Sequence, residues 1–328
     1  METTLVIGGA GYVGSQLVPA LLSTGRRVKV LDTFWYGISH LKSIENSNLE
    51  LIQEDMRNIS KVREALVGVS EVIHLACISN DPSFDLNPEL GKSINLDSFH
   101  PIVKAIKASS IKRFIYASSS SVYGIRDEDR ITEDLKLSPL TDYSKFKAMC
   151  EDILLNESLD DAIITVVRPA TVCGFSARQR FDLVVNILTA NALVHKQIKV
   201  FGGNQYRPNL HISDMVESYL ALLEAPSSAI HREIFNIGSK NLTVREIAES
   251  VRKGVDEEIP IQYLETNDLR SYRVDSSKIA NRIGFVPRYT VDDAIADLKN
   301  NFGVFNSTDL LADPRYINIL RMKELELG

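Results

Sequence analysis

Residues 3–14 of this chain read TTLVIGGAGYVG, an apolar run that leads directly into a glycine-rich turn. The glycines have the spacing G-x-x-G-x-x-G, and the residues after them carry apolar side chains at helical spacing. In such a strand–turn–helix, one glycine permits the turn, one lets backbone N–H groups approach a diphosphate, and one lets the helix pack close to the strand. The segment predicts a dinucleotide-binding turn, with a plain tight turn as the alternative.

Asp32 ends the second apolar run and supports the dinucleotide interpretation. A carboxylate at this place accepts hydrogen bonds from the hydroxyls of the adenosine ribose. The same charge would repel a 2′-phosphate, so the sequence favours NAD over NADP. Arg26 and Arg27 precede this strand, and we interpret them as surface charges.

Short apolar runs alternate with longer segments of helical periodicity in the first half of the chain. The predicted strands are Thr3–Ile7, Val28–Leu31, Leu49–Gln53, Val72–Leu75, Phe114–Ala117 and Ile163–Val167. The predicted helices are Tyr12–Ser23, Asn58–Val67, Glu89–Ala108 and Asp142–Asn156, and Pro101 should kink the third or end its first segment near Phe99. The alternation predicts an α/β fold, a Rossmann-type doubly wound parallel sheet with a smaller mixed α/β substrate-binding lobe.

The regular pattern weakens after Arg168-Pro169, returns at Ile212–Leu223 and Glu233–Ile237, and then weakens again. We therefore expect two domains that share the chain. Residues 1–173 plus about 211–239 should form the NAD-binding Rossmann domain. Residues of about 174–210 plus 240–328 should form the substrate-binding lobe.

Composition excludes several classes of protein. The chain has 328 residues, 44% hydrophobic and 24% charged, which is typical of a folded globular protein. Its formal charge is −6, and no basic run exceeds Arg26-Arg27, so neither nucleic acid nor an anionic membrane is an expected partner.

Features of the N-terminus and the cysteines predict a cytoplasmic protein. Glu2 stands where a signal peptide has a basic residue, and no apolar stretch reaches the roughly 18 residues of a membrane-spanning helix. The odd set Cys77, Cys150 and Cys173 fits neither a disulfide framework nor a zinc site, and indicates reduced thiols.

Tyr143 and Lys147 lie one turn apart near the start of a predicted helix, and so on one face. Bringing a tyrosine from a pKa of about 10 to about 7 requires roughly 4 kcal/mol in favour of the phenolate. The ammonium, the positive helix end and a bound oxidised nicotinamide can supply it. The pair predicts a general base that takes a hydroxyl proton while hydride leaves the same carbon, with a surface helix as the alternative.

The strand Phe114–Ala117 runs straight into Ser118-Ser119-Ser120-Ser121-Val122-Tyr123-Gly124. Ligands of parallel sheets bind at the carboxyl ends of the strands. The four hydroxyls therefore predict hydrogen-bond partners for a sugar oxygen, although hydroxyls at a strand end can also serve the backbone alone.

Together these motifs resemble the extended short-chain dehydrogenase/reductase superfamily, and in particular its nucleotide-sugar epimerase/dehydratase family, which includes UDP-glucose 4-epimerase. The resemblance covers nearly the whole chain. Further motifs that carry it are Asp55-Met56, His74-Leu75-Ala76, Asn95, the stretch 207–214, Asp268-Leu269-Arg270 and the stretch 274–278.

The resemblance implies that Ser119 is the catalytic hydroxyl, Tyr143 the base, and Lys147 the residue that binds the nicotinamide ribose and tunes the base. No metal is expected, because neither His74 nor His211 has a second ligand at a suitable spacing. The resemblance also implies two sets of binding residues. The NAD set is Gly8, Gly11, Tyr12, Val13, Gly14, Asp32, Asp55, Met56, Leu75, Ala76, Asn95, Ser118, Tyr143, Lys147, Pro169 and Val172. The nucleotide-sugar set is Ser119, Ser120, Thr171, Arg180, Asn186, Arg207 and Arg270.

Two departures from the family pattern narrow these expectations. Dehydratases of the family carry Asp and Glu after the catalytic hydroxyl, whereas this chain has Ser120 and Ser121, which disfavours a 4,6-dehydratase. Many members also carry an Asn that holds the substrate phosphate, where this chain reads 168-RPAT-171. We expect those contacts to pass to Arg178, Arg180 or Asn186, with solvated surface charges as the alternative for the two arginines.

The resemblance implies NAD-dependent oxidation at C4 of a UDP-, GDP- or dTDP-linked sugar, with net 4-epimerisation. Alternatives are a 4-dehydrogenase that releases a 4-keto sugar, a non-catalytic NAD-sensing module and a reductase of a small free carbonyl. We also expect the helices at 89–108 and 142–156 to expose a second apolar face. Relatives use these helices in a four-helix dimer interface, so a homodimer is expected.

Overall fold

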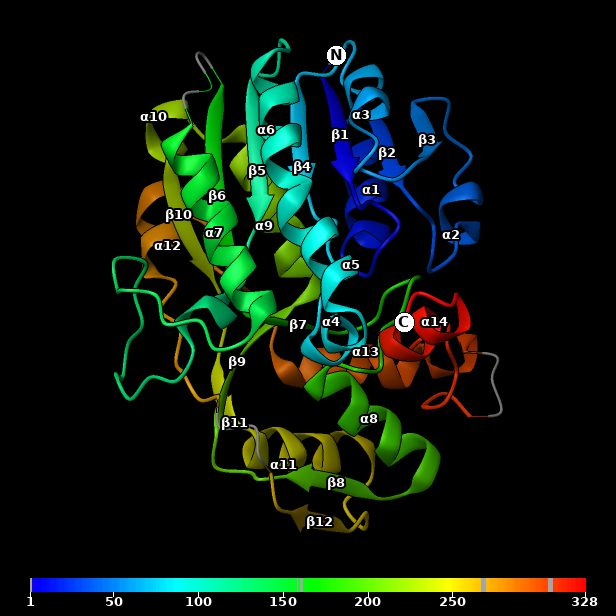
Figure 1. Cartoon of the computed structure of the whole chain (residues 1–328). Helices are drawn as coiled ribbons and strands as arrows, with labels where there is room; N and C mark the ends of the chain where they lie inside the picture. The colour runs from blue at the N-terminus through cyan, green and yellow to red at the C-terminus, as the bar shows by residue number, and fades with distance from the viewer. Residues whose placement is uncertain (1, 158, 160–161, 267–269, 306–308) are drawn as a thin grey trace.

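A seven-stranded parallel sheet forms the centre of the computed structural model, which describes residues 2–157, 159, 162–266, 270–305 and 309–328 (Figure 1). The strands run side by side in the order β3-β2-β1-β4-β5-β6-β10. They are β1 (Thr3–Ile7), β2 (Arg27–Asp32), β3 (Leu49–Gln53), β4 (Glu71–His74), β5 (Arg113–Ala117), β6 (Ile163–Pro169) and β10 (Glu233–Ile237). Each predicted apolar run is a strand of this sheet.

Helices cover both faces of the sheet, which confirms the doubly wound prediction. One face is covered by α3 (Ile59–Ala65), α6 (Phe99–Lys107) and α7 (Asp142–Asn156). The other is covered by α1 (Gly14–Ser23), α9 (Ile212–Glu224), α10 (Ser227–Ile230) and α12 (Ser277–Ile283). The strands read as continuous apolar runs because both of their faces are buried, as in the wholly buried β1.

The helix predicted over residues 89–108 is divided into three pieces. These are α5 (Pro88–Lys92), a π-helical turn (Ser93–Asp97) and α6. The division precedes Pro101, which lies in the first turn of α6, where its missing N–H removes no helical bond. The widened turn carries Asn95, whose side chain accepts a bond from the N–H of Ile78 (2.8 Å) and donates to its carbonyl (2.9 Å).

The lower part of Figure 1 is a smaller mixed α/β arrangement. Its strands are β7 (Thr171–Cys173), β8 (Ile198–Phe201), β9 (Tyr206–His211), β11 (Asn241–Thr243) and β12 (Ile261–Leu264). Its helices are α8 (Val184–His195), α11 (Val244–Val255) and α13 (Val291–Asn300), which share one apolar core. Regular structure continues after residue 239, where the sequence pattern weakens, because α11 and α13 are well-formed helices. Each begins with a capping box, Thr243 with Glu246 and Thr290 with Asp293.

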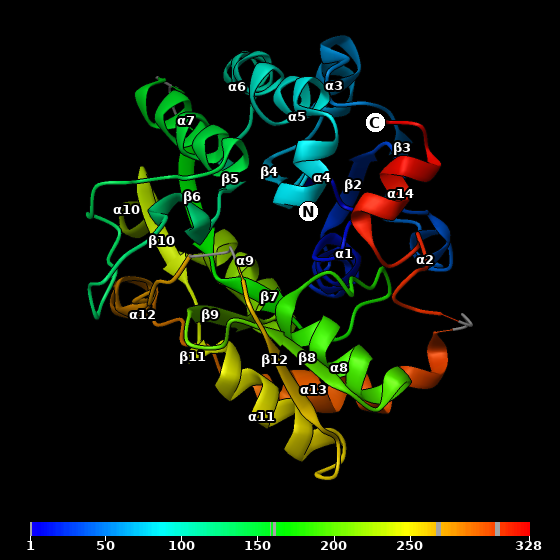
Figure 2. The same ribbon diagram turned by 60° about the horizontal axis from the view of Figure 1, so that its bottom comes forward.

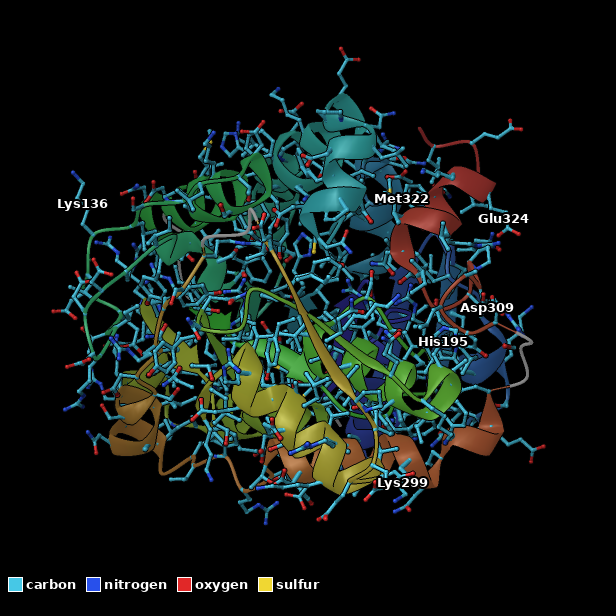
Figure 3. The ribbon with its side chains drawn as sticks, turned by 90° about the horizontal axis from the view of Figure 1, so that it is seen from below. Lys136, His195, Lys299, Asp309, Met322 and Glu324 are labelled. Atoms are coloured by element: carbon cyan, nitrogen blue, oxygen red, sulfur yellow. The ribbon has the colours of Figure 1, made fainter. Side chains whose placement is uncertain are left out.

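The C-terminal segment returns to the first part of the molecule. Helix α14 (Asn318–Glu324) packs against α4 (Asp81–Leu86) and lies beside α2 (Ser39–Lys42) (Figures 1 and 2). Seen from below, α14 with Met322 and Glu324 lies on the opposite side of the molecule from the loop that carries Lys136 (Figure 3). Met322 is buried in the core under α6 and α7. We keep the two-domain division as a proposal, but with α12 and α14 assigned to the Rossmann domain.

None of the helices in the described ranges has both the length and the apolar character needed to cross a membrane.

Candidate active site

A cavity of about 860 Å³ lies between the carboxyl ends of the central strands and the smaller part of the molecule. Its wall includes the glycine turn, Asp32, the serines after β5, the start of α7 and residues of α8 and β9. It opens where β1 and β4 lie side by side, the point at which the strand order reverses. Ligands of open parallel sheets bind at such a point.

The glycine turn has the backbone that the spacing predicts. Gly8 has a φ of +86°, and a Cβ there would lie 2.5 Å from the backbone nitrogen of Ala76. A Cβ on Gly14 would lie 2.4 Å from the carbonyl oxygen of Gly9, so only glycine lets α1 come this close. Gly11 lines the cavity, and a Cβ there would meet only the Gly8 oxygen, at 3.4 Å. The turn therefore leaves room for a diphosphate at the N-terminus of α1.

Asp32 is held at the cavity wall by two backbone donors. Its Oδ1 accepts a bond from the N–H of Phe34 (2.8 Å), and its Oδ2 accepts one from Ala10 (3.0 Å). Burial raises the pKa of Asp32, while these two bonds and the Arg178 guanidinium act in the opposite direction. A carboxylate has about four acceptor sites, so capacity remains for ribose hydroxyls.

The predicted catalytic residues meet at one end of this cavity. A capping box between Thr141 and Ser144 starts α7 and places Tyr143 in its first turn. Lys147 Nζ donates to the carbonyl of Ala117 (2.6 Å) and lies 6.0 Å from the centre of the Tyr143 ring. Ser119 lies at the end of β5, begins the 3-10 turn Ser120–Tyr123, and lines the same wall.

The structure gives the state of Tyr143 in the absence of NAD, so the lowered pKa expected with bound nicotinamide stays a prediction. Removal from bulk water raises the pKa, and the nearby Cys77 and Asp81 act in the same direction. A hydrogen bond from Ser119 and the charge of Arg180 lower it only in part.

Glu151 follows Lys147 by one turn on the same face of α7, and no motif pointed to it. Its carboxylate accepts a hydrogen bond from the Ser118 hydroxyl and forms an ion pair with Arg168 (2.6 Å). All three side chains are buried. The Ser118 hydroxyl therefore donates its hydrogen bond to Glu151 and not to a ligand, although Ser118 lines the cavity. Arg168 also donates to the hydroxyl of Tyr123 (2.8 Å), so the network joins β5, β6 and α7.

The structure brings most of the predicted binding residues to the cavity wall. Those of the NAD set that line it are Gly8, Gly11, Tyr12, Val13, Gly14, Asp32, Asp55, Met56, Leu75, Ala76, Ser118, Tyr143, Lys147, Pro169 and Val172. Those of the nucleotide-sugar set are Ser119, Ser120, Thr171, Arg180, Arg207 and Arg270.

The two remaining residues, Asn95 and Asn186, lie behind the wall. Asn186 accepts a bond from Gly174 (3.0 Å) and donates to the Arg180 carbonyl (2.8 Å) and the Tyr12 hydroxyl (3.1 Å). Asn95 is committed to Ile78, as described above. Both amides therefore hold the wall in place rather than face a ligand. Asp268 lies outside the described residues.

Several arginines at the wall already have protein partners. Arg180 pairs with Asp182 (2.8 Å), and Arg270 pairs with Asp81 (2.5 Å). Asp81, Tyr36 and Asn318 also line the cavity, and they could not be predicted because each comes from a segment without a binding motif. In the described ranges, no group of His, Cys, Asp and Glu side chains has the arrangement of a metal site.

Comparisons with known proteins agree with this geometry. The model of the NAD dependent epimerase/dehydratase family matches residues 4–238. A UDP-glucose 4-epimerase of Lactobacillus helveticus is 28% identical over 89% of this chain and 94% of its own length. A dTDP-glucose 4,6-dehydratase of Streptomyces niveus is 26% identical over 89% of this chain and 90% of its own length.

A solved structure shows the same architecture. The crystal structure of the UDP-glucuronic acid 4-epimerase from Bacillus cereus, in complex with UDP-glucuronic acid and NAD, superposes with a TM-score of 0.83. It is 26% identical and covers 92% of this chain and all of the other. The family resemblance and the NAD cofactor predicted from the sequence are therefore confirmed. This chain is an NAD-dependent enzyme and belongs to the NAD dependent epimerase/dehydratase family.

Proposed function

We propose that the enzyme oxidises C4 of a nucleotide-linked sugar and then reduces the ketone from its other face, so that the net reaction is 4-epimerisation. The observation that carries this proposal is the meeting of Ser119, Tyr143 and Lys147 in one cavity with the glycine turn. A proton acceptor and a dinucleotide site side by side are what oxidation of an alcohol requires.

Each of the three side chains has a distinct role in this proposal. Tyr143 takes the proton of the C4 hydroxyl and later gives it back, and Ser119 orients that hydroxyl. Lys147, anchored on Ala117, keeps an ammonium beside the phenol. Bound NAD supplies the chemistry of accepting a hydride and returning it. The positive charge of an oxidised nicotinamide held beside Tyr143 would favour the phenolate, whereas burial raises the pKa of this phenol.

The cavity is also suited to a nucleotide diphosphate. Lys199, Arg207 and Arg270 line the cavity wall, and guanidinium groups bind phosphate through paired hydrogen bonds. The Asp81 carboxylate holds Arg270 by an ion pair that a diphosphate could replace. We propose a UDP-, GDP- or dTDP-sugar as the substrate.

Two features favour 4-epimerisation over the other reactions of the family. The relatives described above include two 4-epimerases. The residues after Ser119 are Ser120 and Ser121, whose hydroxyls contact Tyr272 (3.3 Å) and Ser119 (2.9 Å) and cannot supply the acid of a 4,6-dehydratase.

A direct test is to incubate the purified protein, without added NAD, with a panel of UDP-, GDP- and dTDP-sugars and to follow the products by NMR. Appearance of a C4 epimer with no lasting NADH absorbance supports the proposal. A ketosugar that accumulates together with NADH would instead identify a 4-dehydrogenase. Bound cofactor with no product from any sugar would favour the sensing module, and failure to bind UDP, GDP and dTDP would favour a reductase of small carbonyls.

A further inference from the structure

Arg178 is a buried cation at the cavity wall that neither the catalytic residues nor the glycine motif uses. Its residue is 4% exposed, and its guanidinium stacks on Tyr36, with 4.0 Å between Cζ and the ring centre. Within the described part of the chain its one hydrogen bond runs from Nη2 to Oδ1 of Asn318 (2.5 Å), and the buried Nε has no partner. No carboxylate of the described residues forms an ion pair with it, although Asp32 lies within electrostatic reach.

Burial of an unpaired guanidinium such as that of Arg178 costs free energy of folding. Desolvation lowers the pKa of Arg178 to about 10, and the neighbouring Arg180 adds to that effect. A buried guanidinium without a carboxylate and with an unsatisfied N–H destabilises the folded chain. The arrangement becomes favourable when an anion enters the cavity beside it. Arg178 is therefore available to pair with an anion that enters the cavity.

The surroundings of Arg178 identify which anion it meets. Its backbone N–H donates to the Ser15 hydroxyl in the first turn of α1 (3.2 Å), and Ser176 donates to the carbonyl of Tyr12 (2.8 Å). The side chain then extends to Tyr36, just beyond β2 and Asp32. The segment thus contacts the start of α1 and the residues just after β2, the elements that carry the glycine turn and Asp32. The one anionic group of NAD is its diphosphate.

We propose that Arg178 binds the diphosphate of NAD beside the glycine turn and, held by Tyr36 and Asn318, covers the cofactor so that NAD stays bound through turnover. Asn318 belongs to α14, and its Nδ2 also donates to the Ser79 hydroxyl (3.3 Å), so the cover joins three distant segments. A retained cofactor returns its hydride to the sugar from which it came. The retention part of this inference therefore rests on the proposed epimerase function. The contact between Arg178 and the diphosphate requires only that NAD binds, whichever reaction the enzyme catalyses.

The test compares ADP, which carries the diphosphate, with adenosine, which does not. Calorimetric titration of the cofactor-free full chain should show that Arg178→Gln weakens ADP and NAD binding roughly 10- to 100-fold, the loss expected for a charge-assisted hydrogen bond. Adenosine binding should be unchanged. The matched control is Arg245→Gln, since Arg245 stacks on Tyr263 at 4.1 Å but does not line the cavity.

Retention is measured separately, as the rate at which bound NADH is displaced by excess NAD. NADH release should be faster in Arg178→Gln. It should also be faster in Asn318→Ala, which keeps the guanidinium but removes the side chain that holds it. Without ligand, Arg178→Gln should melt no lower than the parent, because the change removes an unpaired buried charge.

Three results would overturn the proposal. The first is an unchanged affinity for ADP, and the second is an equal loss of affinity for ADP and for adenosine. The third is a loss of affinity for UDP, titrated in the same way, with no loss for ADP. None of them depends on which sugar is turned over, so this test and the test of epimerisation fail independently.

Discussion

Tyr143 shows how a single residue depends on its ligands. Its enclosure raises the pKa of the phenol, and Lys147 lies beside it without a direct bond to its oxygen in the described contacts. We predict that Tyr143→Phe lowers kcat by roughly 10²- to 10⁴-fold, the usual contribution of a general base, and leaves NAD affinity unchanged. Steady-state kinetics and a cofactor titration check this. Tyr263→Phe, on the smaller part of the molecule, is the control, and full turnover by the Tyr143 variant would refute the assignment.

His74, at the end of β4, is a pH-sensitive residue of the core. Burial, with a smaller contribution from Lys147, lowers its pKa to about 3, and its ring packs against both Phe99 and Tyr116. Below a pH of about 6.5 the unfolded chain binds a proton here that the folded chain does not. The free energy of unfolding should therefore fall by about 1.4 kcal/mol per pH unit from this site, until the pH approaches 3.

His74→Phe keeps the ring packing and removes the titration, so its stability should depend less steeply on pH between about 6 and 4. Urea unfolding at a series of pH values measures this. His231→Phe, at an exposed position, should keep the parent slope. Identical slopes for the parent and the His74 variant would contradict the prediction.

At the scale of elements, α7 is fixed to the sheet by two successive contacts on one face. Lys147 binds the end of β5 at Ala117, and one turn later Glu151 binds Ser118 and Arg168. We predict that Glu151→Ala lowers the free energy of unfolding by about 3–5 kcal/mol, because it leaves the Arg168 guanidinium buried without its carboxylate. Urea unfolding measures the loss.

The double variant Glu151→Ala with Arg168→Met distinguishes an unpaired charge from a lost side-chain contact. Removing both charges should restore part of the stability, because an apolar replacement has no desolvation penalty. If the double variant is less stable than the single one, packing rather than charge is the main contribution of Glu151.

The elements that the sequence predicted are those whose signal is local. The central strands were visible because both of their faces are buried, and α11 and α13 could have been predicted from the capping boxes at Thr243 and Thr290. The π-helical turn at 93–97 could not, because it serves a contact between Asn95 and Ile78. Asn186 was misplaced for a similar reason, since its partner Gly174 lies on another segment.

At the scale of the whole molecule, contacts across the cavity connect segments far apart in the chain. Arg180 donates to the Ser79 hydroxyl (2.9 Å), Asn318 contacts the same hydroxyl, and Arg270 pairs with Asp81. All of them meet the short segment after β4, next to the catalytic phenol. Spacing within one segment carries no information on contacts between distant segments, so these contacts could not be predicted from the sequence. The glycine turn and the pair Tyr143 and Lys147 depend on local spacing, and the sequence placed them correctly at the cavity wall.

The assembly of the molecule gives the last prediction. The described structure does not show the continuous apolar face expected on the two helices, since His100, Lys104 and Lys107 are exposed on α6. On α7, Met149 is 46% exposed and lies one turn from the half-buried Ile153. We propose a homodimer in which α6 and α7 of two copies pack about a twofold axis, with the two Met149 side chains near that axis.

Light scattering should then give twice the mass of the chain, and Met149→Arg should reduce it to the monomer, because a twofold axis places the two new charges opposite each other. NAD binding should survive in this variant, since Met149 does not line the cavity. Val67→Arg is the control, because Val67 is 72% exposed and lies outside both helices. A monomeric parent, or a dimer that tolerates Met149→Arg, would place the interface elsewhere or exclude it.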